Sequence, residues 1–147
     1  METSVIIGMV SATVLGSLLG LERSVSGKHA GMRTYALVSL GAALFSAVGV
    51  LASYKLALFS GTNPLQIAGS VAIGIGFIGA GLSAMRGDHA ELTTAAGIWL
   101  AAAVGVACGL GFFSIAVVST VLGILIFSVF TRVEHAISSR YRTQGGE

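Results

Sequence analysis

The sequence predicts an all-α protein, a polytopic membrane bundle of five transmembrane helices, and two observations carry this prediction. The first is composition, because 54% of the 147 residues are hydrophobic, only 10% are charged, and the mean hydropathy is +0.92. The second is the placement of charge, since uncharged runs cover residues 3–21, 34–54, 56–85 and 92–131. About 20 apolar residues cross a bilayer as a helix, so every run is long enough to span it.

The boundaries of the later spans follow from turn signals. The run 92–131 is long enough for two spans, joined by a tight hairpin at Gly109–Gly111. The third span is predicted at about residues 66–85, after the turn signal Gly61–Pro64, which contains the only proline. We therefore expect a transmembrane domain over residues 1–131 and a short basic cytoplasmic tail over residues 132–147.

The orientation follows from lysine and arginine, which concentrate in cytoplasmic loops. Lys55 falls on one side of the predicted bundle, and the other seven basic residues fall on the opposite side. These seven are Arg23, Lys28, Arg33, Arg86, Arg132, Arg140 and Arg142. The distribution predicts an N-terminus outside and a C-terminus in the cytoplasm.

The segment GIGFIGAGL, residues 74–82, contains the G-x-G-x-x-G spacing of dinucleotide-binding folds. That function needs a strand before the glycines and an aqueous site, whereas these glycines lie in a charge-free stretch of membrane-spanning length. Small residues in membrane helices let neighbouring backbones approach closely, which favours helix packing. The alternative is a kinked or broken helix whose freed carbonyls line a cavity. The candidate packing residues are Gly16, Gly20, Gly74, Gly76, Gly79, Gly81 and Trp99.

These packing residues lead to expectations about the arrangement of the spans. Span three should be enclosed by other helices, with Trp99 from the middle of span four packed against its small-residue surface. Span five is richer in bulky residues and should be the most lipid-exposed. The segments KHAGMRTYALVSLGAA from residue 28 and DHAELTTAAGIWLAAA from residue 88 match at seven of sixteen positions. This similarity indicates a possible repeat of two parallel hairpins followed by a fifth helix.

Polar residues gather at the predicted cytoplasmic ends of the spans. They are Glu22, Arg23, Arg33, Thr34, Asp88 and Thr94. One interpretation is interfacial anchoring, with arginines reaching the lipid–water boundary and Glu22 pairing with one of them. The other is a polar vestibule or partner surface. A hydrated Mg²⁺ could sit at such a rim, because it retains waters and binds one or two carboxylates. Separately, Thr93 and Thr94 could bond across to a neighbouring helix, but we expect them to cap the fourth span.

Several functions are disfavoured by the residues that are missing. No charged residue lies in the middle of a predicted span, so a proton relay or carboxylate ion site at the bilayer centre is not expected. The three histidines match no zinc spacing, and no catalytic constellation stands out, so we expect a protein that is not an enzyme, has no resident cofactor and binds no nucleic acid. The single cysteine, Cys108, is either a small inert residue or a thiol that pairs between subunits.

Three segments together carry a family resemblance: GLERSVSGKHAGMRTYALVSLGAALF, GIGFIGAGL and LTTAAGIWLAAAVGVACGLG. They resemble the membrane domain of the MgtC/SapB family over about residues 8–125. The resemblance implies a bacterial inner-membrane protein linked to adaptation to Mg²⁺ limitation and, in some pathogens, to survival inside phagocytes. Some members are held to act on other membrane proteins, including the F-type ATP synthase. The family motif maps onto Gly20, Glu22, Arg23, Ala30, Gly31, Arg33, Thr34, Gly74, Gly76, Phe77, Gly79, Ala80, Gly81, Leu92, Thr94, Ala95, Ala96 and Trp99.

Two departures limit what the resemblance implies. The segment RGDHAEL lacks the basic residue and the glycine that members commonly place before the leucine. Longer members also carry a soluble C-terminal domain, so this chain is expected to be a short member without it. Two functional hypotheses remain: a regulator that binds partner membrane proteins through small-residue helix faces, and an oligomeric transporter or channel for Mg²⁺ or another small solute. In either case we expect a homo-oligomer, with a dimer the simplest form.

Overall fold

The structure is a computed structural model, and it describes residues 2–55, 63–86, 90–133 and 137. Within these ranges the chain is helical, and five helices are long and apolar enough to cross a membrane, as predicted. A short π-helix, η1, continues the fifth of them. The elements are α1 (Glu2–Val25), α2 (Met32–Lys55), α3 (Pro64–Arg86), α4 (Ala90–Gly109), α5 (Phe113–Leu125) and η1 (Ile126–Phe130).

The predicted hairpin between spans four and five is confirmed. Gly111, between α4 and α5, has a φ of +84°, a left-handed conformation that favours glycine. The amide of Phe112 donates to the Ala107 carbonyl at 2.7 Å, and that of Gly111 donates to the Cys108 carbonyl at 3.1 Å. These two bonds form a Schellman motif, which satisfies the last carbonyls of α4 and reverses the chain.

The start of α3 follows from the local sequence. Pro64 occupies the first helical position, where its missing amide hydrogen costs nothing. The Asn63 side-chain oxygen accepts a hydrogen bond from the Leu65 amide at 3.0 Å and so caps the helix. From there α3 continues unbroken to Arg86, so the alternative of a broken third helix is not observed.

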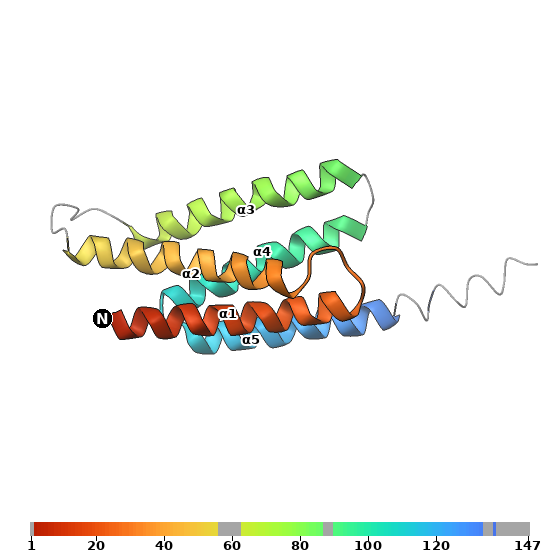
Figure 1. Ribbon diagram of the computed structural model, residues 1–147, viewed down its shortest axis with the longest axis horizontal. Coiled ribbons are helices and arrows are strands. Elements are labelled where there is room, and N and C mark those ends of the chain that lie inside the picture. The colour runs from red at the N-terminus through yellow and green to blue at the C-terminus, as the bar shows by residue number, and fades with distance from the viewer. Residues whose placement is uncertain (1, 56–62, 87–89, 134–136, 138–147) are drawn as a thin grey trace, which may run out of the picture.

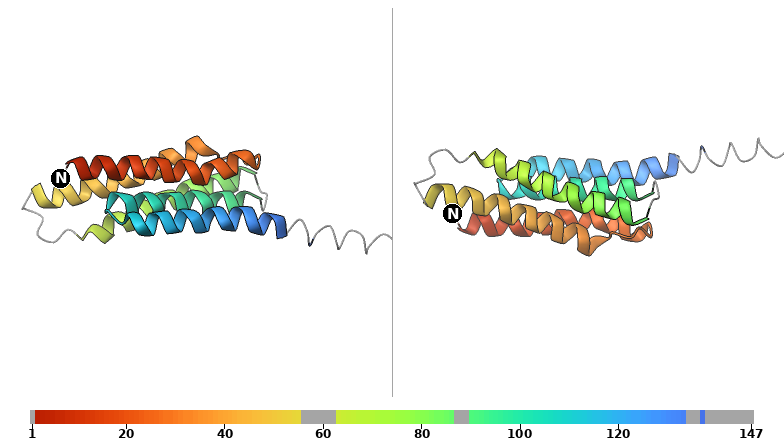
Figure 2. Two further views of the ribbon diagram at one scale, coloured as in Figure 1. Left: turned by 90° about the horizontal axis from the view of Figure 1, so that it is seen from below. Right: turned by 90° about the horizontal axis from the view of Figure 1, so that it is seen from above.

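The helices form an elongated bundle in which α1, α3 and α5 run in one direction and α2 and α4 in the other (Figure 1). Helix α4 is central, because it contacts all four of the others, as the two further views also indicate (Figure 2). One end holds the N-terminal turn of α1 beside the end of α2, where Lys55 Nζ lies 3.9 Å from Glu2 Oε1. We call the opposite end, with Arg23, Arg33 and Arg132, the arginine end. Which side of the membrane it faces stays a prediction.

Helix α3 lies at the periphery, contrary to the expectation that span three is enclosed. Among the described residues it packs only against α2 and α4. In an 18-residue window only 6% of the residues are buried for Leu65–Leu82, against 22% within Phe113–Val133, so α3 is also more exposed than the fifth span. Both expectations are wrong for the single chain. The physical reason is that small residues permit close approach without selecting a neighbour, and the alanine-rich α4 takes the central position instead.

The predicted packing glycines therefore divide into two groups. A Cβ atom at Gly16 would lie 2.7 Å from the Tyr35 carbonyl oxygen, and one at Gly20 would lie 2.6 Å from the Met32 Cα atom, so both glycines permit the close contact of α1 with α2. A Cβ atom at Gly79 would touch Ala95 at 3.4 Å. By contrast, Gly74, Gly76 and Gly81 have open space where a side chain would be.

The predicted repeat places its two segments on α2 and α4. These helices begin at Met32 and Ala90, run in the same direction and pack extensively against each other (Figure 1). This arrangement is the one that two parallel hairpins would produce. The repeat itself stays a prediction.

Candidate functional site

The last turn of α1 carries a buried cation, Arg23, whose side chain is only 2% exposed. Its Nε atom donates to Oε2 of Glu22 at 2.6 Å, and the other oxygen of Glu22 accepts from Ser26 Oγ at 2.8 Å. The local sequence fixes this turn, because Gly27 adopts a φ of +67° and lets the Lys28 amide donate to the Arg23 carbonyl at 3.0 Å. The pair is thus anchored where α1 ends.

An aromatic ring from the fifth span covers the arginine. The guanidinium carbon of Arg23 lies 4.1 Å from the ring centroid of Phe127, a distance typical of a cation–π interaction. Phe127 belongs to η1 and is itself buried. The Nη2 atom of Arg23 is buried and has no hydrogen-bond partner among the described residues.

Tyr35 of α2 lies near the same ring, because both side chains approach Gly97 of α4. Its hydroxyl donates to the Thr94 carbonyl oxygen of α4 at 3.4 Å, which is a long and weak hydrogen bond. Gly97 makes the approach possible, because a Cβ atom there would lie 2.7 Å from Phe127 Cζ and 3.0 Å from Tyr35 Cζ. We define Glu22, Arg23, Tyr35, Gly97 and Phe127 as the Arg23 cluster.

The electrostatics of the cluster limit its chemistry. Arginine stays protonated in proteins, so Arg23 cannot act as a general acid or base. Its charge is balanced by the carboxylate of Glu22, and burying such a pair costs desolvation that good geometry only partly repays. Arg23 therefore links α1 to η1 through the Phe127 ring, and Tyr35 links α2 to α4 through the Thr94 carbonyl.

The structure brings together only part of the predicted polar rim. Glu22 and Arg23 form the cluster, and Thr94 joins it through its carbonyl oxygen. Arg33 and Thr34 are exposed on α2 and are not members of the cluster, while Asp88 lies outside the described residues. The expectation that Thr94 caps its helix is wrong, because α4 begins earlier, at Ala90.

Tyr35 and Phe127 are cluster members that the sequence analysis missed. Tyr35 carried a detectable signal, because a tyrosine inside an apolar span needs a partner for its hydroxyl. Phe127 carried none, since the π-turn that places it over Arg23 has no recognised sequence pattern.

Metal binding finds little support in the described ranges. No group of three or more histidine, cysteine, aspartate or glutamate residues is placed there to hold a metal ion. The carboxylate of Glu22 is already engaged by Arg23 and Ser26. A metal at the rim would have to displace these bonds.

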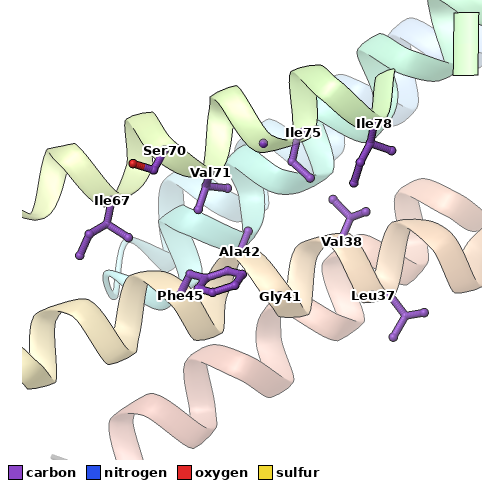
Figure 3. A pocket seen from close by; sticks show the side chains of 11 residues that line it. Leu37, Val38, Gly41, Ala42, Phe45, Ile67, Ser70, Val71, Ile75 and Ile78 are labelled. Carbon is purple, nitrogen blue, oxygen red and sulfur yellow. The ribbon is translucent and has the colours of Figure 1, made fainter. Parts of the chain in front are cut away.

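Trp99 lies on the side of α4 that faces α3. It is 53% exposed and lines a cavity of about 240 Å³ together with Ala68 and Ala72 of α3. A larger groove of about 520 Å³ separates α2 from α3 (Figure 3). Its walls are apolar side chains such as Phe45 and Ile75, with Ser70 as the polar residue among them.

Five helices that are long and apolar enough to cross a membrane define a multi-pass α-helical membrane protein. The model of the MgtC family matches residues 9–136, and the chain belongs to that family. This finding confirms the family resemblance noted in the sequence. A multi-pass bacterial membrane protein follows from the helices and the family together.

Three curated relatives illustrate the similarity. The chain is 34% identical over 143 residues to the "Putative magnesium transporter YhiD" of Escherichia coli, covering 95% of this chain and 66% of that protein. It is 38% identical to an uncharacterized protein of Haemophilus influenzae, covering 92% and 60%, and 41% identical to Protein MgtC of Salmonella typhimurium, covering 80% and 48%. The chain thus spans about half to two thirds of the length of these relatives. No solved structure matches it.

Proposed function

We infer that this chain is a non-enzymatic regulator in the bacterial inner membrane that binds partner membrane proteins through α3 and serves adaptation to Mg²⁺ limitation. The observation that carries this proposal is the outer face of α3, which we define as Gly69, Ile73, Gly76, Phe77 and Ala80. All five residues are exposed, and neither glycine has an atom near the position of a side chain.

Glycine on a lipid-facing surface is costly without a partner. Each interior glycine weakens a helix by about 1 kcal/mol relative to alanine. Small residues in membrane helices repay this cost when another helix packs against them, since close approach gains dispersion contacts and lipid offers no hydrophobic driving force. Ile73 and Phe77, 78% and 82% exposed, stand beside the glycines as side chains for a partner to pack around. A second helix packed on this face would explain both the exposed glycines and the exposed large apolar side chains.

The proposal is also supported by the charge-free middle of every span and by family membership. Two occupants fit the outer face: another membrane protein, of which the membrane sector of the F-type ATP synthase is the first to test by resemblance, and a second copy of this chain. Association through α3 would leave the Arg23 cluster intact, because α3 contributes nothing to it.

A membrane association assay tests the proposal. Gly76→Leu places a bulky side chain on the outer face and should reduce association, measured by a split-reporter assay or by energy transfer in native membranes, about ten-fold or more. The matched control is Gly74→Leu, which changes the same residue type on the same helix but points into the groove between α2 and α3. Equal loss in both variants, or no loss in either, contradicts a role for this face.

A second candidate function is an oligomeric transporter or channel for Mg²⁺ or another small solute. The name of the Escherichia coli relative, a putative magnesium transporter, favours it, as does the acidic residue Glu22 at the arginine end. Purified protein in liposomes separates the two functions. The regulator should give no Mg²⁺ flux above empty vesicles, whereas flux abolished by Glu22→Gln or Asp88→Asn would establish transport and overturn the regulatory proposal.

A further inference from the structure

A groove of about 480 Å³ lies between the last turns of α1 and the η1 segment, at the arginine end. The residues that line this groove change from apolar to polar along its length. Leu18 and Leu21 on α1, with Ile124 on α5, form the deeper part, and Ser26, Ser128 and Arg132 form the part nearest the end of the bundle. Both helices run toward the arginine end (Figure 1). Apart from Val25, the lining residues of both walls therefore turn from apolar to polar in the same direction.

This gradient matches the shape of a phospholipid, which has a polar headgroup at the membrane surface and acyl chains below it. A partner helix or a soluble anion matches it less well, because a helix would need apolar contact to the end of the groove, and a soluble anion makes no use of the deep section. Grooves with basic residues between membrane helices near the surface are recognised binding sites for anionic headgroups.

The charges of the groove favour a phosphate. Glu22 lines the wall, but its carboxylate is already paired with Arg23 at 2.6 Å and accepts from Ser26 at 2.8 Å. Arg132 is exposed and forms no ion pair with any other described residue, so within the described ranges its positive charge at the mouth of the groove has no counter-ion. A phosphodiester group can accept hydrogen bonds from the Arg132 guanidinium and from the Ser128 hydroxyl.

A second observation comes from directly behind the wall. Arg23 is nine-tenths buried or more, and its Nη2 atom has no partner among the described residues. Both of its contacts, Glu22 and the Phe127 ring, belong to the groove lining. The Nη2 atom is thus an unused hydrogen-bond donor behind the groove wall, while the charge of Arg23 is balanced by the Glu22 carboxylate.

The π-turn of η1 shapes the mouth of the groove. A π-helical turn interrupts the regular bonding of a helix and is often found at functional sites. Here the Thr131 hydroxyl donates to the Phe127 carbonyl at 2.6 Å, which satisfies a backbone group within the turn. From these observations we propose that the groove between α1 and η1 binds one anionic glycerophospholipid, with the phosphate at Arg132 and Ser128 and an acyl chain along Leu18, Leu21 and Ile124.

Native mass spectrometry of the full chain tests this proposal. The protein is titrated with dioleoyl phosphatidylglycerol and, separately, with dioleoyl phosphatidylcholine, which has the same acyl chains but no net charge. We expect one phosphatidylglycerol molecule to be retained more tightly than any phosphatidylcholine. Arg132→Gln should weaken this retention about five-fold, the effect expected for one basic residue near an anionic headgroup.

Two further variants make the test specific. Arg33→Gln removes an exposed arginine at the same end of the bundle but on α2, outside the groove, and should leave the retention unchanged. Ser128→Leu fills the groove without altering charge and should abolish retention. If Ser128→Leu fails to fold, the comparison of Arg132→Gln with Arg33→Gln carries the test, because both side chains are exposed.

Three outcomes would overturn the proposal. Equal weakening by Arg132→Gln and Arg33→Gln would mean diffuse attraction of lipid to the whole arginine end. Equal retention of the two lipids by the unaltered chain would mean that the positive charge at the groove does not select an anionic headgroup. Displacement of the lipid by equimolar sn-glycerol 3-phosphate would identify a site for a soluble phosphate instead of a lipid.

Discussion

Replacement of Arg23 by methionine removes the charge from the Arg23 cluster while keeping much of the side-chain volume. Two interactions are lost. A charge-assisted hydrogen bond such as the one to Glu22 contributes about 1.5–3 kcal/mol, and a desolvated cation–π contact such as the one to Phe127 contributes about 2 kcal/mol. The variant also leaves the carboxylate of Glu22, 14% exposed, without its counter-ion. We expect Arg23→Met to lower the free energy of unfolding by about 3–5 kcal/mol, the range for breaking one half of a buried ion pair.

The measurement is reversible unfolding in mixed micelles with increasing SDS, followed by circular dichroism and by the fluorescence of Trp99, the only tryptophan. Glu22→Gln and the double variant complete a thermodynamic cycle, and the coupling free energy should be about 1.5–3 kcal/mol, since the double variant leaves no unpaired charge. Arg33→Met, at an exposed position, is the control and should change stability by less than about 0.5 kcal/mol. Additive effects of the two single variants would refute an energetic pair at the end of α1.

Three further predictions concern other described residues. Gly16→Ala should destabilise the bundle by about 1–3 kcal/mol in the same SDS unfolding assay, because its Cβ atom would lie 2.7 Å from the backbone of α2. Gly41→Ala, which has open space at its Cβ position, should be neutral or stabilising. A change of the same sign in both variants would contradict the packing of α1 on α2. Tyr35→Phe should cost less than about 1 kcal/mol in that assay, since its hydrogen bond is 3.4 Å long, and a larger loss would mean a stronger partner for the hydroxyl. Cys108, 1% exposed, should react with a maleimide in micelles at least ten-fold more slowly than after SDS unfolding, and rapid labelling of the folded chain would show that the end of α4 opens.

The sequence was sufficient to place the helices because a membrane span is a local property. A charge-free run of about 20 residues must be helical in lipid, since every backbone group needs an internal partner. The turn at Gly111 and the cap at Asn63 are local as well, and each depends on a single residue whose backbone or side-chain chemistry suits the position. These features needed no knowledge of which helices are neighbours.

The positions of the helices relative to one another could not be derived in the same way. Glycine and alanine occur on several sides of both α3 and α4, and their spacing indicates that close packing is possible without naming the partner. The observed packing glycines of α4, Gly105 and Gly109, approach the backbone of α2, and nothing in the local pattern distinguished them from the open glycines of α3. The choice depends on contacts between distant segments.

The burial of Arg23 is the clearest case of a non-local effect. At the end of a predicted span, an arginine ordinarily extends to the lipid–water boundary, which is why anchoring was one of the two interpretations. Its burial requires the Phe127 ring, more than a hundred residues later in the chain, and the close contact of Tyr35 and Phe127 over Gly97. The sequence identified the two charged residues, and the tertiary structure determined that they face inward.

The same division of contacts explains how one chain can be both a stable bundle and a surface for association. Helices α1, α2, α4 and the η1 continuation of α5 meet at the Arg23 cluster, while α3, among the described residues, packs only against α2 and α4 and contributes nothing to the cluster. Because the interactions that stabilise the bundle are concentrated away from the outer face of α3, a partner helix can pack there without disturbing them. Variants of the Arg23 cluster and variants of that face should therefore separate stability from association, which a bundle with α3 at its centre could not do.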